Sequence, residues 1–220
     1  MTAAPHPTAE EPVPLLLPPL SFVVPDGFHH VPVDASADEL PASTAAFVRG
    51  LYPAGEAELW NSAAPYYEQV AALLSTAGLL YSGLGIFGMG DEGVAHCSLS
   101  VAVCASQHAD TEAAAQGMLA ILSGDPLNDA RWLDLPCGPA VSCVSMRELS
   151  VDAEQTTASE EQARIITGQI QIYLPFPTGP YMAVFTLSTA SMQCWGEFCD
   201  MLTAVLQTVS FTDSEEPDDG

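Results

Sequence analysis

Residues 168–189 read GQIQIYLPFPTGPYMAVFTLST and carry the clearest structural signal in the chain. Apolar and polar residues alternate before the turn Pro177-Thr178-Gly179-Pro180, and the alternation resumes after it. A period of two places successive side chains on opposite faces of a strand. The stretch therefore predicts a β-hairpin that has one buried face and one more polar face.

A second hairpin is predicted upstream. Two strand-like runs, residues 79–87 and 94–104, flank the glycine-rich connection 88–93. In the second run small and branched apolar side chains share one face, and the other face is semi-polar, with His96, Ser98, Ser100 and Cys104. Two antiparallel hairpins that each have one apolar face favour a single sheet covered by helices.

Helices are predicted where apolar residues recur every three to four positions or follow a capping residue. The expected segments begin near Asp38, Glu56, Asp110 or Thr111, and Ser191. Pro65 lies inside the second of them and predicts either a kink or two separate helices. Shorter strands are expected at 21–24, 31–33, 132–135, 140–146 and 209–211, and a loop or a helix cap at 151–161.

These elements predict one α+β domain over residues 20–211, an α/β/α sandwich with a helical insertion at 38–76. The first 19 residues contain six prolines and no periodicity, which is typical of a disordered arm. Residues 212–220 predict an acidic, disordered tail.

Two segments carry a family resemblance. The first has the strand Gln169-Ile170-Gln171-Ile172-Tyr173-Leu174-Pro175, a second strand at 182–189, a helix with Trp195 and Phe198, and the ending Ser210-Phe211. The second is Phe22-Val23-Val24-Pro25-Asp26-Gly27-Phe28. Residues 168–211 and 22–28 thus resemble the closing and opening sections of PsbP-like α/β/α sandwich proteins. The resemblance implies an antiparallel sheet between helical layers and, for most relatives, a non-enzymatic accessory or binding role, but the insertion 38–76 departs from the family pattern.

The charge is one-sided. Asp and Glu number 28 against four arginines and no lysine, which gives a formal net charge of −24. Nucleic acid and anionic membranes are bound through clustered Lys and Arg, so neither is expected as a partner. A protein partner with a basic surface is expected instead. The lack of lysine also excludes Walker-type phosphate sites and Schiff-base chemistry.

No apolar run reaches the length of a membrane span and no secretory signal is evident, so we expect no membrane insertion and a cytoplasmic location. The six cysteines are expected to be free thiols, because none of their spacings indicates a zinc site or a disulfide framework. They are Cys97, Cys104, Cys137, Cys143, Cys194 and Cys199. No catalytic, cofactor or metal residue is assigned from the sequence, and the adjacent His29 and His30 are expected to point to opposite faces.

Acidic pairs are expected to form solvated surface, because paired carboxylates do acid-base work only where burial separates their pKa values. These pairs are Glu10-Glu11, Asp91-Glu92, Glu160-Glu161 and Asp218-Asp219. The leading hypothesis is a non-enzymatic binding or accessory protein. The alternative is a small-molecule or metal-binding domain that uses the semi-polar face with His96, Ser98 and Cys104. A hydrolytic enzyme of unrecognised type is the third hypothesis.

Overall fold

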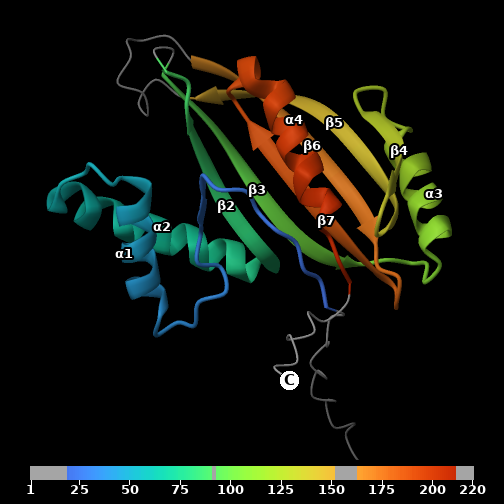
Figure 1. The fold of residues 1–220 in the computed structure, drawn as a ribbon, viewed down its shortest axis with the longest axis horizontal. Helices are drawn as coiled ribbons and strands as arrows, with labels where there is room; N and C mark the ends of the chain where they lie inside the picture. The colour runs from blue at the N-terminus through green and yellow to red at the C-terminus, as the bar shows by residue number, and fades with distance from the viewer. Residues whose placement is uncertain (1–18, 91–92, 152–162, 212–220) are drawn as a thin grey trace, which may run out of the picture.

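The computed structural model describes residues 19–90, 93–151 and 163–211. The strands are β1 (Phe28–His30), β2 (Leu79–Gly88), β3 (Val94–Ala105), β4 (Asp129–Leu135), β5 (Gly138–Val151), β6 (Ala163–Pro175) and β7 (Tyr181–Thr189). The helices are α1 (Leu40–Leu51), α2 (Ala57–Thr76), α3 (Thr111–Leu122) and α4 (Trp195–Gln207), with a 3-10 turn η3 (Met192–Cys194) before α4. The predicted α+β class is confirmed (Figure 1).

The seven strands form one open antiparallel sheet in the order β1-β2-β3-β7-β6-β5-β4. Both predicted hairpins, β2–β3 and β6–β7, are present and join through the pairing of β3 with β7. The strands expected at 132–135 and 140–146 form a third hairpin, β4–β5, in which Leu135 pairs with Gly138. Gly138 has a φ of +138°, which favours glycine at the first position of β5.

One face of the sheet is apolar and is covered by α4, which Figure 1 shows in front of the central strands. Strand residues on this face are almost fully buried: Ala95, Cys97, Leu99, Val101, Ile172, Leu174, Ala183, Phe185 and Leu187. From α4, Phe198, Leu202, Val205 and Leu206 complete the main core. This packing buries the apolar stripe predicted for the last helix and is the principal source of hydrophobic stabilisation in the fold.

The other face is covered only at its two ends (Figure 1). The α1–α2 pair packs beside β1 and β2, and α3 packs on β4, β5 and β6. The predicted helical insertion has a small core of its own, formed by Val31, Val33, Phe47, Val48, Leu51 and Ala71. Between the two helical blocks lies a central part of the sheet face, and its side chains are polar and partly exposed.

The first strand differs from the prediction. Residues 21–24 and 31–33 were expected to be extended, whereas β1 lies between them. Pro25 and Pro32 flank β1 and lack the N–H that a ladder requires, which confines the strand to the intervening residues. Ser21 forms only an isolated bridge with Ser210. Residues 209–211 were expected to form a closing strand, and this bridge is the β-pairing that the structure shows there.

Two helix predictions are also resolved. Helix α2 runs through Pro65 as one helix, so the two-helix alternative is wrong. Pro65 and Asn61 are both exposed, so water can satisfy the Asn61 carbonyl that the proline leaves unpaired. Ser191 does not cap α4, because η3 intervenes and no side chain caps that helix.

No helix in the described part of the chain is long and apolar enough to cross a membrane. Three predicted segments lie outside the described residues: the arm 1–19 apart from Pro19, the loop at 152–161, and the tail 212–220. So do the acidic pairs named above.

Candidate functional site

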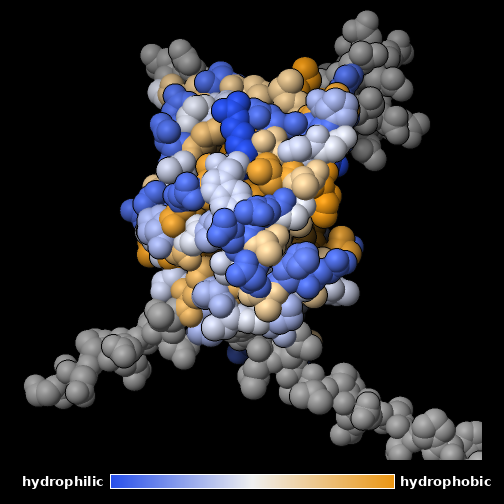
Figure 2. Space-filling view, turned by 90° about the vertical axis from the view of Figure 1, so that its right-hand side faces the viewer, coloured by the Kyte–Doolittle hydropathy of each residue, from blue (hydrophilic) through white to orange (hydrophobic). Residues whose placement is uncertain are grey.

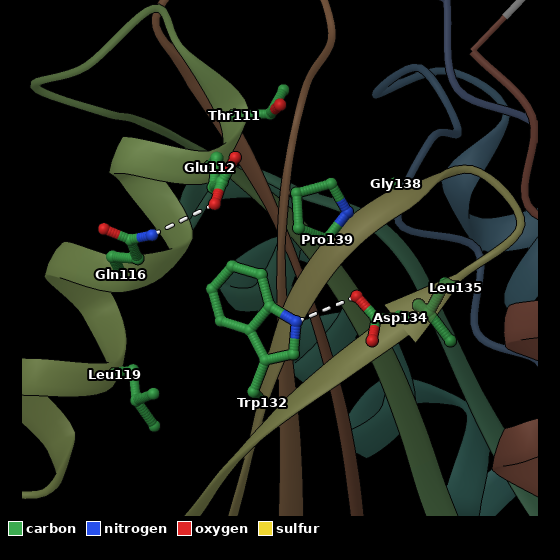
Figure 3. Close-up of a pocket in the computed structure, with 9 residues that line it drawn as sticks. All are labelled: Thr111, Glu112, Gln116, Leu119, Trp132, Asp134, Leu135, Gly138 and Pro139. Atoms are coloured by element: carbon green, nitrogen blue, oxygen red, sulfur yellow. Dashed lines mark hydrogen bonds between the residues drawn. The ribbon is translucent and has the colours of Figure 1, made fainter.

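A cavity of about 750 Å³ opens between α3 and the β4–β5 hairpin. We call it the α3 pocket, and its lining is Thr111, Glu112, Gln116, Leu119, Trp132, Asp134, Leu135, Gly138 and Pro139 (Figure 3). Figure 2 shows the side of the molecule that carries α3, where hydrophilic and hydrophobic residues are interspersed. The pocket therefore combines apolar walls with polar groups, as ligand sites commonly do.

Helix α3 supplies one wall of the α3 pocket. Asp110 is its N-cap, and its Oδ1 accepts a 2.8 Å hydrogen bond from the backbone N–H of Ala113, which fixes where the helix begins. Glu112 and Gln116 lie four residues apart and therefore share a face. Nε2 of Gln116 donates to Oε1 of Glu112 at 3.2 Å. The Glu112 carboxylate is thus oriented by its own helix and keeps its second oxygen available.

Strand β4 supplies the opposite wall. Trp132 and Asp134 are two residues apart, so both side chains point to the same face of the sheet. The indole Nε1 of Trp132 donates a 2.9 Å hydrogen bond to Oδ1 of Asp134. In Figure 3 the indole ring stands between the α3 side chains and Asp134. This bond holds the ring and the carboxylate in a fixed relation to each other.

The α3 pocket suits a cationic group. Two carboxylates, Glu112 and Asp134, and one indole face line it, and no Lys, Arg or His is among its lining residues. The nearest basic side chain along β4, Arg131, alternates to the other face and forms a bidentate pair with Asp129 at 2.9 and 2.7 Å. The hydrogen bonds from Arg131 lower the pKa of the Asp129 carboxyl. Arg131 is therefore engaged and does not neutralise the pocket.

A second feature is a polar strip at the centre of the same sheet face, made of Ser98, Ser100, Gln169, Gln171, Thr186 and Ser188. The register places Ser98 opposite Ser188, and Ser188 opposite Gln169. Nε2 of Gln169 donates to Oγ of Ser188 at 3.1 Å. All six side chains are partly exposed, so they present hydroxyl and amide groups without any charge.

The polar strip adjoins a cavity of about 360 Å³ beneath the helical insertion. Tyr52 and Tyr67 line this cavity, and their hydroxyl oxygens lie 3.2 Å apart. Burial is the main cause that raises the pKa of the Tyr67 hydroxyl above its ordinary value, followed by the hydrogen bond to Tyr52. The Tyr67 phenol therefore stays neutral, and the pair presents hydroxyl groups to the cavity.

The structure separates the three residues of the alternative hypothesis. His96 and Ser98 line the cavity beside the polar strip. Cys104 lines a different cavity of about 240 Å³ next to α3, with His108 and Met118. Cys104 lies six residue steps along β3 from Ser98, a distance of roughly 20 Å, so one small ligand cannot contact both. Within the described ranges, no group of three or more His, Cys, Asp or Glu side chains is arranged to hold a metal ion.

Hydrogen bonds connect His96 to the end of β7 and to the turn that follows it. Oγ1 of Thr189 donates a 2.6 Å hydrogen bond to the His96 carbonyl oxygen, and Oγ of Ser191 accepts one of 3.1 Å from the His96 backbone N–H. Nδ1 of His96 lies 3.4 Å from the same Ser191 oxygen. Ser191 is buried, and its hydroxyl is occupied in joining β3 to the end of β7. The His96–Ser191 pair therefore joins two strands of the sheet.

The remaining candidate residues are dispersed. Nε2 of His30 lies 3.6 Å from Asp34, and its ring packs near Tyr81 with centroids 5.3 Å apart. All six cysteines are free thiols in the structure. Burial raises the pKa of the Cys97 thiol to about 12 and also raises that of Cys104. A raised pKa suppresses the thiolate, so neither of these thiols is activated for nucleophilic attack.

None of the residues of the α3 pocket was predicted as a site residue from the sequence. A signal existed in the i, i+4 pair Glu112 and Gln116 and in the alternate pair Trp132 and Asp134. Each pair predicts only that two side chains share a face. That both faces meet depends on α3 lying over β4 and β5, which no local pattern indicates.

Family models, curated proteins and solved structures give no match to this chain. The resemblance to PsbP-like proteins therefore remains a prediction from residues 168–211 and 22–28.

Proposed function

We propose that the protein is a non-enzymatic binding protein that contacts a basic partner, and that the α3 pocket receives a cationic side chain of this partner. The observation that carries the proposal is the pairing of two carboxylates with an indole face in a cavity that has no basic lining residue. The accessory role implied by the PsbP-like resemblance is consistent with this proposal.

An arginine side chain fits the chemistry of the α3 pocket best. A guanidinium group stacks on an indole face and donates charge-assisted hydrogen bonds to carboxylate oxygens. Trp132 offers the ring, and Asp134 and Glu112 each keep one carboxylate oxygen that no described side chain occupies. A net charge of −24 adds long-range attraction that steers a basic surface toward the molecule.

The test measures binding of a synthetic nonapeptide in which arginines alternate with glycines, by isothermal titration calorimetry at low ionic strength. The double variant Glu112→Gln/Asp134→Asn should weaken binding by about threefold to tenfold, because each exposed ion pair contributes up to about 1 kcal/mol. Trp132→Leu should weaken it further, because the stacking surface is lost. The matching lysine peptide should bind less tightly than the arginine peptide.

The matched control is Glu58→Gln/Asp200→Asn, which removes the same charge from exposed positions on α2 and α4. Its affinity for the arginine peptide should stay within about twofold of the original protein, because distant exposed charges are largely screened. Equal losses in the two double variants would show that the peptide responds only to net charge, and the α3 pocket would then have no specific role.

A second candidate function is supported by the polar strip. We propose that the strip and its adjoining cavity hold a neutral small molecule with several hydroxyl or amide groups, since the strip presents such groups from three strands and no charge. Thermal-shift measurements with a panel of neutral polyhydroxylated compounds test it. A compound that raises the melting temperature should lose this effect in Gln169→Ala/Ser188→Ala and keep it in Thr203→Ala on α4.

A further inference from the structure

Three sulfur-bearing side chains pack against the main core on the apolar face of the sheet, away from the α3 pocket and the polar strip. Met89 follows the end of β2, Cys194 closes η3, and Met201 lies in α4. All three line one cavity of about 510 Å³ together with Phe87, Ala95, Glu197 and Phe198. We call Met89, Cys194 and Met201 the sulfur cluster.

The fold brings these residues together by two separate routes. Cys194, Glu197, Phe198 and Met201 follow one another at steps of three, one and three residues, so the helical turn places them along one side of α4. Met89 arrives from the β2–β3 connection, where its backbone N–H donates to the Gly93 carbonyl at 2.9 Å. A contact between residues 105 positions apart thus depends on tertiary structure and not on a sequence motif.

Within the sulfur cluster, Cys194 and Met89 are spaced as a chelating pair. Sγ of Cys194 lies 3.5 Å from Sδ of Met89. The usual metal–thiolate distance is about 2.3 Å. Two sulfurs that both lie at this distance from one metal ion are separated by a distance close to 3.5 Å. Nε2 of Gln193 is 3.9 Å from the same Met89 sulfur. The thioether is therefore accessible to a polar group from the solvent side, and an incoming ion displaces this weak contact together with the thiol proton that Cys194 donates to Met89.

The donor set selects the type of ion. Thiolate and thioether ligands favour soft monovalent copper, whereas magnesium and calcium require several oxygen ligands. Zinc in structural sites takes four Cys, His or carboxylate ligands, and the cavity offers one cysteine and one carboxylate, Glu197. Phe87 and Phe198 supply apolar walls that exclude water from one side. Net negative charge concentrates cations near the surface.

We propose that Met89, Cys194 and Met201 form a binding site for one copper(I) ion. Cys194 binds as the thiolate and releases its proton to solvent, while the two methionines bind as neutral thioethers. No electron is transferred in this step. The site lies on the α4 side of the sheet and acts independently of the proposed contact with a basic partner.

The test titrates the full-length reduced protein with copper(I) under anaerobic conditions, in competition with the chelator bathocuproine disulfonate. The original protein should withdraw one copper(I) equivalent from the chelator. Met89→Leu conserves volume and leaves every thiol in place, and it should weaken the affinity by at least about tenfold. The control Met146→Leu removes a thioether that is 69% exposed on β5, and it should change the affinity by less than about twofold.

A second readout locates the ion. Copper(I) at one equivalent should protect Cys194 from alkylation by iodoacetamide and leave the reactivity of Cys199, five residues further along the chain in α4, unchanged. Mass spectrometry of the digested protein measures both thiols, and this readout decides the matter even if a variant fails to fold. Equal affinity in Met89→Leu and Met146→Leu, or protection of a thiol other than Cys194, would overturn the proposal and leave the cluster as hydrophobic packing.

Discussion

Gly168 of β6 lies directly beneath the indole ring of Trp195 at the start of α4. A Cβ added at Gly168 would come within 2.6 Å of Cζ3 of that ring and within 2.9 Å of the Met192 sulfur. The absence of a side chain at one position of the sheet therefore sets how closely the first turn of α4 approaches it. This contact joins strand β6 to the start of helix α4.

Gly168→Ala is expected to destabilise the fold by about 1–3 kcal/mol, because the ring must move or the strand must shift. Urea unfolding followed by circular dichroism measures the change in unfolding free energy. Gly88→Ala is the control, because its Cβ would meet nothing within 4 Å. In a Trp195→Ala background the cost of Gly168→Ala should fall, and an unchanged cost there would contradict the steric explanation.

Asp110→Ala is expected to cost about 1 kcal/mol of stability, because the N–H of Ala113 at the start of α3 loses its acceptor. Asp110→Asn should retain most of the stability, since asparagine caps equally well without the charge. Thermal unfolding compares the two variants. If asparagine proved as destabilising as alanine, the charge near the helix N-terminus, and not the capping bond, would account for the effect.

The protein is expected to lose stability as the pH rises above 9. The Cys97 thiol has an ordinary pKa of 9.0, and burial raises that pKa to about 12 in the folded state. Between these values the unfolded chain has lost the proton and the folded chain retains it, so the unfolded state binds fewer protons and stability falls with increasing pH. Burial also raises the pKa of Tyr81 to about 12, which adds to the same trend.

Urea unfolding in the presence of reductant at pH 8 and pH 10.5 measures this dependence. Cys97→Ala should show a smaller loss between the two pH values than the original protein, because the contributions of Tyr81 and other groups are common to both. Identical losses would exclude the buried thiol as a cause.

Binding of the arginine peptide should weaken when ionic strength rises from about 0.01 M to about 0.15 M, because the Debye length falls from about 30 Å to about 8 Å. Stopped-flow kinetics should assign most of the change to the association rate and little to the dissociation rate. A salt-independent association rate would mean that the charge of −24 serves another purpose, such as keeping the protein dispersed.

The sequence alone determined the elements whose cause is local. The alternation in residues 168–189 and the glycine connection at 88–93 predicted both central hairpins, because a period of two repeats within a few residues. Asp110 or Thr111 predicted the start of α3 for the same reason, since a cap acts within one turn, and Asp110 is the residue that caps it. The excess of acidic over basic residues likewise follows from the composition alone.

The tertiary structure alone decided which faces meet. The pairing of β3 with β7 brings Ser98 next to Ser188 across 90 positions, and the placement of α3 over β4 brings Glu112 toward Trp132. Helix α4 likewise carries Cys194 to Met89. These contacts follow from burying the apolar faces together, a non-directional force that acts on whole elements and leaves no signature at any single residue. The composition of each candidate site is therefore set by packing at long range, and the residues involved become a group only once the sheet has formed.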